Sequence, residues 1–322
     1  MSSARENKSL AWITGANGLI GNYLVQTAPK FAPRWRVWAL TRDQFDLLDF
    51  AAIRREFQKD RPQLVIHCAA ITVISDAQKN PELARRVNVE VTKLLAELAA
   101  EIPFAPGANG APVSDPARLP DQLLRAGSET GAPTSFVFFS TDLVFDGRKG
   151  DYTETDAANP LHVYGETKLA AEEIVLKNPR HLVIRTSLNG GVSLSGNRAF
   201  NEQLRRSMQA SGQGMKLFTD EFRCPIPAVE TARAVWELAQ KNCAGIYHVA
   251  GAEKLSRLQI GELLINRWPE VKTQISSCSA KDFPGPSRAL DTSLDVSKVQ
   301  KVLSTPLPGL GGWLAANPNE LF

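Results

Sequence analysis

The chain has 322 residues, of which 43% are hydrophobic and 22% are charged, and its formal net charge is +3 at pH 7. This length is sufficient for about two domains with a large buried core, which excludes a disordered chain and a small disulfide-stapled scaffold. The nearly balanced charge excludes a protein that binds nucleic acid or an anionic membrane through an overall basic field.

The cysteines and the apolar stretches indicate the compartment. Cys68, Cys224, Cys243 and Cys278 lie far apart and lack the spacing of metal ligands, so we expect reduced thiols and no metal site. No stretch of the sequence approaches the roughly 20 consecutive apolar residues that a membrane span requires. We therefore expect a cytoplasmic protein that does not bind a membrane.

Short apolar runs alternate along the chain with segments of helical periodicity. Helical spacing of apolar residues appears at residues 53–59, 83–100 and 169–176. Continuous apolarity over the length of a strand is typical of strands that are covered on both faces. The alternation therefore predicts an α/β fold with a doubly wound parallel sheet. The predicted strands cover residues 10–14, 35–40, 64–69, 135–140, 181–186 and 245–250.

One long segment interrupts this alternation. Residues 102–134 are rich in proline and glycine, so we interpret them as an insertion that forms a surface loop, a lid or an oligomer contact. After residue 187 the periodicity weakens, which favours a first lobe over residues 1–187 and a smaller second lobe over residues 188–322. The two lobes are interleaved, because the predicted strand at 245–250 rejoins the first sheet.

The first predicted strand leads directly into the glycine-rich segment GANGLIG at residues 15–21, which a helical run follows. Gly15 permits a tight turn, Gly18 lets the backbone approach a phosphate, and Gly21 lets the helix pack on the strand. The free N–H groups and the dipole of the helix N-terminus favour an anion. The segment therefore predicts a site for the pyrophosphate of a dinucleotide, although its spacing is G-x-x-G-x-x-G rather than G-x-G-x-x-G.

The end of the second predicted strand bears on the choice of dinucleotide. An acidic residue usually holds the adenosine ribose of NAD at this place. Here the strand is followed by Arg42, whose planar guanidinium suits the 2′-phosphate of NADPH. The alternative is a solvated arginine paired with Asp43. We favour NADPH as the cofactor, with NADH also accepted.

Three polar residues suggest acid–base chemistry. Thr141 follows the fourth predicted strand, at the edge of an open α/β sheet where ligands bind. Tyr164 and Lys168 have the i, i+4 spacing that places two side chains on one helix face. A fixed ammonium lowers the pKa of a phenol from its ordinary value of about 10. Combined with the glycine loop, this pattern predicts a catalytic Tyr–Lys pair beside Thr141 rather than a surface pair.

These motifs resemble the extended short-chain dehydrogenases/reductases, and most closely the dTDP-4-dehydrorhamnose reductase family. The resemblance implies a Rossmann domain over residues 1–187 and a substrate-binding lobe over residues 188–322. It also implies NAD(P)H-dependent reduction of the C4 keto group of a nucleotide-linked 6-deoxy sugar, with a homodimer as one candidate assembly. It rests on TGANGLIG at 14–21, FDLLD at 45–49, HCAAIT at 67–72, STDLVFDG at 140–147, ETDAANPLHVYGETKLAAEE at 154–173, IRTS at 184–187, DEFRCPIP at 220–227 and RALDTSLDVSKV at 288–299.

The resemblance implies a role for individual residues. Tyr164 would protonate the C4 oxygen, Thr141 would hydrogen-bond that oxygen, and Lys168 would hold the nicotinamide ribose. Asn88 matches an asparagine that orders the central helix. The implied cofactor contacts are Gly15, Asn17, Gly18, Leu19, Ile20, Gly21, Arg42, Asp46, Leu47, Ala69, Ala70, Thr72, Tyr164 and Lys168. The implied substrate contacts are Val73, Asp142, Leu188 and Arg223.

Departures from the family pattern leave alternatives open. Leu143 and Leu188 stand where the reductases commonly carry Tyr and Trp, so the sugar is not fixed by the resemblance. A dehydratase is disfavoured, because Asp142 is not followed by the second acid that water elimination needs. A sugar-nucleotide 4-epimerase and a non-catalytic subunit resembling the regulatory subunit of methionine adenosyltransferase remain. We expect His67 to be a packed side chain, because Tyr164 already supplies the proton.

Overall fold

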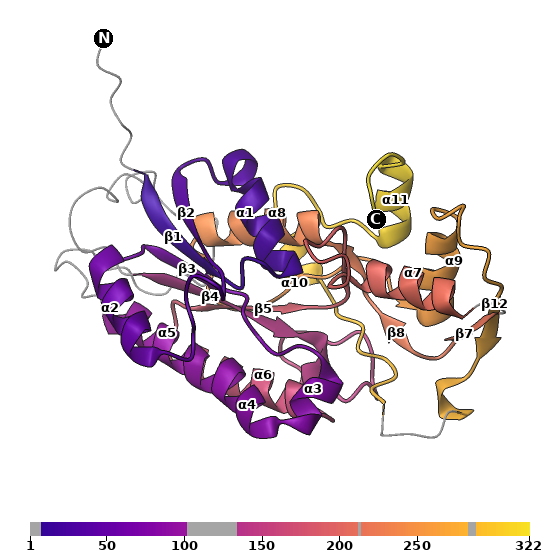
Figure 1. The fold of residues 1–322 in the computed structure, drawn as a ribbon, viewed down its shortest axis with the longest axis horizontal. Helices are drawn as coiled ribbons and strands as arrows, with labels where there is room; N and C mark the ends of the chain where they lie inside the picture. Colours follow the sequence, from indigo (N-terminus) through magenta and orange to yellow (C-terminus); the bar gives the residue numbers. More distant parts are fainter. Residues whose placement is uncertain (1–7, 102–133, 212–213, 283–287) are drawn as a thin grey trace, which may run out of the picture.

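The computed structural model describes residues 8–101, 134–211, 214–282 and 288–322. All of the predicted insertion except Thr134 lies outside the described residues. A six-stranded parallel sheet runs through the centre of the larger part of the molecule, in the order β10-β5-β4-β3-β1-β2 (Figure 1). The strands are β1 (Ser9–Thr14), β2 (Trp35–Leu40), β3 (Leu64–His67), β4 (Ser135–Thr141), β5 (Leu182–Thr186) and β10 (Gly245–His248).

The six predicted strands and the parallel doubly wound sheet are confirmed. Strand ends differ from the prediction by at most two residues. The apolar runs are continuous because successive side chains enter two different cores. In β4, Phe136 and Phe138 pack in the cluster on one face of the sheet, whereas Val137 and Phe139 pack in the cluster on the other.

Helices cover both faces of this sheet (Figure 1). On one face α1 (Leu19–Phe31) packs against α8 (Ala228–Gln240), and the buried Trp236 indole donates a hydrogen bond to the Leu24 carbonyl at 3.0 Å. α10 (Ser297–Gln300) lies on the same side. The other face is covered by α2 (Phe50–Asp60), α5 (Val91–Glu101) and α6 (Val163–Val175).

The predicted helix at 83–100 is interrupted. It consists of α4 (Pro81–Arg85), a π-helical turn at Arg86–Glu90 and α5, and the short helix α3 (Ile74–Lys79) precedes it. The π-helical turn contains Asn88, which is fully buried and bonded to segments outside its own helix. π-Helical turns of this kind are frequent at functional sites, because the extra residue redirects a side chain.

A smaller lobe lies beside the C-terminal part of the sheet and has its own apolar cluster, which contains Met208, Trp268 and Trp313. Its helices are regular although their sequence periodicity is weak. In the described part of the chain, short 3-10 helices occur at Ala280–Asp282 and, after β4 of the central sheet, at Asp142–Val144. The lobe contains β6 (Asn189–Gly190), α7 (Phe200–Ala210), β7 (Met215–Phe218), β8 (Phe222–Arg223), β9 (Ile226–Pro227), β11 (Leu255–Ser256), α9 (Arg257–Ile265), β12 (Ile275–Cys278) and α11 (Leu310–Ala316).

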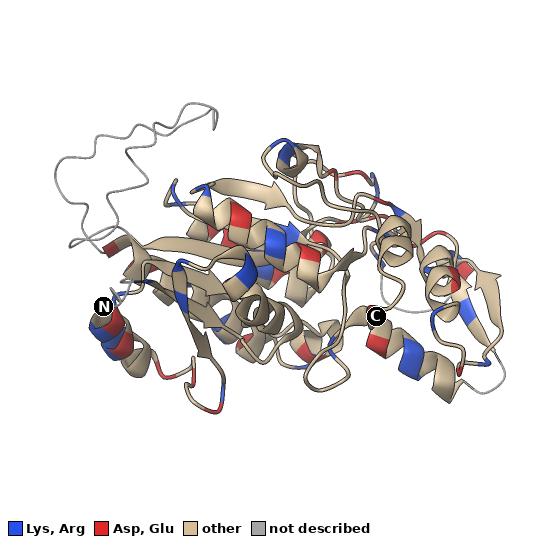
Figure 2. Ribbon diagram, turned by 90° about the horizontal axis from the view of Figure 1, so that it is seen from above, with Lys and Arg blue, Asp and Glu red and all other residues tan. Residues whose placement is uncertain are grey.

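Charged residues of both signs alternate along the outer helices (Figure 2). This interspersed arrangement agrees with the formal net charge of +3. Among the described residues, no helix combines the length and the apolar character that crossing a membrane would need.

Candidate functional site

A cleft of about 740 Å³ opens where the C-terminal ends of the central strands meet the smaller lobe. This is the place where open α/β sheets bind their ligands, and the volume suits a dinucleotide or a substrate of similar size. The cleft is lined by every residue that the sequence assigns to the cofactor, namely Gly15, Asn17, Gly18, Leu19, Ile20, Gly21, Arg42, Asp46, Leu47, Ala69, Ala70, Thr72, Tyr164 and Lys168.

The glycine loop fits a pyrophosphate. Gly15 has a φ of +67°, and a Cβ there would lie 2.7 Å from the Ala69 backbone nitrogen. A Cβ on Gly21 would collide with the Gly15 carbonyl oxygen, so the helix approaches the loop more closely than any side chain would allow. α1 begins after Gly18 without a side-chain cap and without an acidic residue in its first turn. Its first N–H groups are therefore available to an anion.

The side chains of Thr14 and Asn88 hold the wall of the cleft beside the glycine loop. The Thr14 hydroxyl lies 2.7 Å from His67 Nδ1 and accepts a hydrogen bond from the Ala69 N–H at 3.3 Å. The Asn88 side chain bonds both the N–H and the carbonyl of Ile71, at 2.8 and 3.1 Å. Burial lowers the pKa of His67 to about 3, so this histidine stays neutral and acts in packing, as the sequence suggested.

Arg42 lies at the end of the cleft that β2 borders. It is exposed, and the described structure contains no ion pair between Arg42 and Asp43. Asp46, which also lines the cleft, accepts a hydrogen bond from the Leu48 N–H at 3.0 Å and so belongs to a local turn. The Arg42 guanidinium is therefore free to meet a ligand at this end.

Thr141, Tyr164 and Lys168 come together on the floor of the cleft, and each is at most 8% exposed. Burial raises the pKa of Tyr164 to about 12, the charge of Asp142 acts in the same direction, and a hydrogen bond with Thr141 opposes them. The lowering that we expected requires the ammonium together with an oxidised nicotinamide, whereas burial in the protein itself acts in the opposite direction. The phenol therefore stays protonated at neutral pH, which is the form that can donate a proton.

Lys168 is buried beneath this floor. Its Nζ lies 4.0 Å from the centroid of the Phe138 ring. Burial lowers the pKa of Lys168 to about 7, although the charges of Glu172 and Cys68 oppose this shift. The ammonium is therefore poised to lose its proton near neutral pH, and an adjacent anion would favour the charged form.

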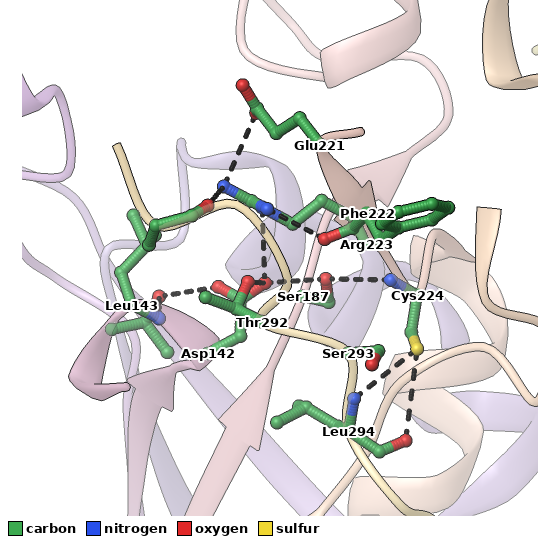
Figure 3. Close-up of polar contacts among 12 residues, drawn as sticks. Asp142, Leu143, Ser187, Glu221, Phe222, Arg223, Cys224, Thr292, Ser293 and Leu294 are labelled. Carbon is green, nitrogen blue, oxygen red and sulfur yellow. Dashed lines mark hydrogen bonds and ion pairs between the residues drawn. The ribbon is translucent and has the colours of Figure 1, made fainter. Parts of the chain in front are cut away.

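Asp142 is the centre of a polar network that includes Ser187, Arg223 and Thr292 (Figure 3). Its Oδ1 accepts a hydrogen bond from the Thr141 hydroxyl at 3.1 Å. Its Oδ2 accepts hydrogen bonds from the Ser187 hydroxyl at 2.7 Å and the Thr292 hydroxyl at 3.0 Å, and Arg223 Nε lies 3.8 Å away. Asp142 is only 4% exposed, so the carboxylate joins three distant chain segments inside the protein.

Arg223 is largely engaged within the protein. Its guanidinium donates to the carbonyls of Phe222 at 2.7 Å and Ala289 at 3.0 Å, and it pairs with Glu221 at 3.3 Å (Figure 3). Arg257 and Arg288 also contact the buried Glu221 carboxylate and line the cleft. Sequence reasoning did not identify these two arginines, although RALDTSLDVSKV begins at Arg288.

The structure places all but one of the predicted substrate residues in the cleft. Asp142, Leu188 and Arg223 line the cleft, whereas Val73 does not. Val73 precedes α3 and is 45% exposed on the surface. Leu143, the second departure from the family pattern, also lines the cleft.

Two family models match the chain. Residues 117–313 match the RmlD substrate binding domain, and residues 11–185 match the NAD dependent epimerase/dehydratase family. The second match contains the glycine loop and the Thr–Tyr–Lys group, and the first contains most of the smaller lobe, which borders the cleft.

Curated relatives of more than one kind align over almost the whole chain. A protein named as a probable low-salt glycan biosynthesis reductase from Haloferax volcanii is 30% identical, over 95% of this chain and 96% of its own. A dTDP-4-dehydrorhamnose reductase from Sinorhizobium fredii is 26% identical over 92% of each chain. The methionine adenosyltransferase 2 subunit beta from Xenopus laevis is also 26% identical, over 91% of this chain and 82% of its own.

Solved structures share the fold. A hypothetical dTDP-4-dehydrorhamnose reductase from Sulfolobus tokodaii has a TM-score of 0.74 at 26% identity and covers 93% of this chain and 97% of its own. The Bacillus anthracis dTDP-4-dehydrorhamnose reductase in complex with NADP has a TM-score of 0.78 at 20% identity and covers 96% of this chain and 98% of its own.

Proposed function

Since the chain belongs to the NAD dependent epimerase/dehydratase family and contains an RmlD substrate binding domain, we propose that it is an NAD(P)H-dependent reductase of nucleotide-linked sugars. The reaction would reduce the C4 keto group of a 6-deoxy sugar, as the names of the reductase relatives suggest. The observation that carries the proposal is the meeting of Thr141, Tyr164 and Lys168 in the same cleft as the glycine loop.

The residues of the cleft fit a dinucleotide. The uncapped N-terminus of α1 and the close approach of Gly15 and Gly21 would accommodate the pyrophosphate. Arg42 would meet the 2′-phosphate of NADPH, and NADH would bind without this contact. The remaining contacts would come from Asp46, Leu47 and the segment 69–72. The reduced nicotinamide supplies the hydride.

Reduction of a ketone to an alcohol needs one hydride and one proton. Tyr164 would donate the proton to the C4 oxygen, since burial keeps its phenol protonated at neutral pH. Thr141 would place its hydroxyl against the same oxygen and so orient the sugar. Lys168 would hold the nicotinamide ribose, and its positive charge would favour the phenolate that proton donation leaves behind.

The substrate would occupy the part of the cleft that faces the smaller lobe. Leu188 would pack against the sugar or its nucleotide, and Arg223 would lie beside it. The family resemblance also assigns Val73 and Asp142 to the substrate, but Val73 does not line the cleft and the Asp142 carboxylate is bonded within the protein. We also propose that the enzyme acts in the cytoplasm and assembles as a homodimer.

A turnover assay separates this proposal from the alternatives. Purified protein is incubated with dTDP-4-dehydrorhamnose and NADPH or NADH, and the nicotinamide absorbance and the sugar product are followed. A reductase oxidises one nicotinamide for each sugar reduced. A 4-epimerase interconverts sugars without net oxidation. Binding of the dinucleotide with no turnover of several keto-sugars would favour the non-catalytic subunit, which the 26% identity to a methionine adenosyltransferase subunit keeps as the second candidate.

A further inference from the structure

The carboxylate of Asp142 has little capacity left for a ligand. Two hydroxyl donors and the Arg223 guanidinium surround Oδ2, at 2.7, 3.0 and 3.8 Å, which occupies both lone pairs of this oxygen. Oδ1 accepts from Thr141 at 3.1 Å. An acidic residue that is almost fully buried and already bonded in this way is suited to hold its neighbours in place (Figure 3).

Thr141 is the neighbour that matters for the reaction. Its hydroxyl donates to Asp142, its oxygen accepts from the Leu143 N–H at 3.2 Å, and the Tyr164 phenol is a third hydrogen-bond partner. Rotation about the Cβ–Oγ1 bond can turn the hydroxyl proton from Asp142 toward a ligand without moving Oγ1. Loss of the Asp142 contact would remove one of these restraints.

The donors on Oδ2 determine how Asp142 is held. Ser187 follows β5, and Thr292 lies in the segment 289–294, which the hydrogen bonds from Phe222 N to Leu290 O and from Asp291 N to Gly147 O fix in the protein. Thr292 is fully buried, and Asp142 is the partner of its hydroxyl. Ala289, the first residue of this segment, lines the cleft together with the preceding Arg288.

We propose that Thr292 is a positioning residue for the reduction: together with Ser187 it holds the Asp142 carboxylate, which in turn fixes the side chain of Thr141. The inference rests on the proposed function, in which Thr141 contacts the reacting C4 oxygen. The hydrogen bond from Thr292 to Asp142 thereby connects the segment 289–294 with the end of β4, which carries Thr141.

Three variants of the full chain test this. Thr292→Val removes the hydroxyl at nearly constant volume, and Thr292→Ser keeps it. Thr273→Val is the matched control, because Thr273 is also buried and donates its hydroxyl to the Met208 carbonyl, and neither residue lines the cleft. Ser187→Ala, which removes the second donor on the same oxygen, replaces Thr292→Val if that variant does not fold.

The first measurement needs no substrate. The amide resonance of Leu143, whose N–H donates to Thr141, is recorded by NMR in the ligand-free protein. We expect it to shift in Thr292→Val, to return to the wild-type position in Thr292→Ser, and to stay there in Thr273→Val. An unshifted Leu143 resonance in folded Thr292→Val overturns the inference.

The second measurement is steady-state reduction of the sugar. We expect kcat of Thr292→Val to fall about tenfold or more, with little change in KM for the sugar, because a misplaced group affects the transition state more than binding. An unchanged kcat, or an effect confined to KM, overturns the inference, since the latter would mean that Asp142 binds the sugar directly. A wild-type protein without turnover counts against the proposed function alone, and the Leu143 resonance then decides the positioning.

Discussion

Arg185 and Glu172 form a bidentate ion pair inside the protein, in which Arg185 Nε donates to Glu172 Oε1 at 3.0 Å and Arg185 Nη2 donates to Oε2 at 2.7 Å. The side chains are 4% and 1% exposed. Glu172 lies one turn after Lys168 on α6, and Arg185 lies on β5, so the pair ties the helix that carries Tyr164 and Lys168 to the sheet. This connection fixes the position of the catalytic helix against the face of the sheet.

Breaking this pair should destabilise the protein strongly. Glu172→Gln leaves the Arg185 charge buried without a counter-ion, which typically lowers the free energy of unfolding by about 3–5 kcal/mol. Urea denaturation measures the change. Glu173→Gln is the control, because Glu173 is the next residue on the same helix and is exposed. Equal, small losses in both variants would contradict the role assigned to the pair.

Arg42 should determine the preference for NADPH. Arg42→Ala removes a charge-assisted contact with the 2′-phosphate, so we expect the Kd for NADPH to rise about tenfold and the Kd for NADH to change little. Fluorescence titration with both dinucleotides measures this. Arg36→Ala, on the exposed side of the same strand and outside the cleft, serves as the control. Equal weakening of both dinucleotides would show that Arg42 does not recognise the phosphate.

The close contact between α1 and the glycine loop should be essential for dinucleotide binding. A Cβ at Gly21 collides with the backbone of Gly15, so Gly21→Ala must push the helix away from the loop. We expect the Kd for NADPH to rise about tenfold or more. Gly312→Ala is the control, because a Cβ at this position meets nothing within 4 Å. This substitution should stabilise α11 by up to about 1 kcal/mol, since alanine favours a helix more than glycine does. Unaltered binding by Gly21→Ala would rule out this phosphate site.

The pH dependence of catalysis should report Lys168. A lysine loses its charge as the pH rises through its pKa, and burial places the pKa of Lys168 at about 7 against an ordinary 10.5. We therefore expect kcat/KM for the dinucleotide, which describes the free enzyme, to decline above about pH 7. Lys168→Arg keeps the charge and should move the decline to higher pH. A flat profile from neutral to mildly alkaline pH would mean that the charge is not needed.

The sequence predicted the sheet well, and the residues that it assigns to the cofactor lie in one cleft, because both depend on local patterns. Apolar runs of strand length fix β1 to β5 and β10, whose side chains alternate between two cores. The glycines at 15, 18 and 21 predict the loop, since a Cβ at each position would lie too close to a backbone atom. The i, i+4 spacing of Tyr164 and Lys168 places both on one helix face whatever surrounds them.

What the sequence did not predict depends on contacts between distant segments. Thr292 lies 150 residues from Asp142, and a single buried threonine gives no pattern that indicates its partner. The raised pKa of Tyr164 and the lowered pKa of Lys168 arise from burial, which the spacing of the two residues does not reveal. The π-helical turn around Asn88 is equally hidden, because its sequence continues the helical periodicity on both sides.

The proton donor is the centre of this account, and Tyr164→Phe tests it most directly. The rate of NADPH oxidation with dTDP-4-dehydrorhamnose and the Kd for NADPH are measured for wild type and variant in parallel. We predict that the variant loses turnover and binds NADPH with nearly wild-type affinity, because only the phenolic hydroxyl is removed. A variant that retains the wild-type rate would contradict the assignment of Tyr164 as the acid.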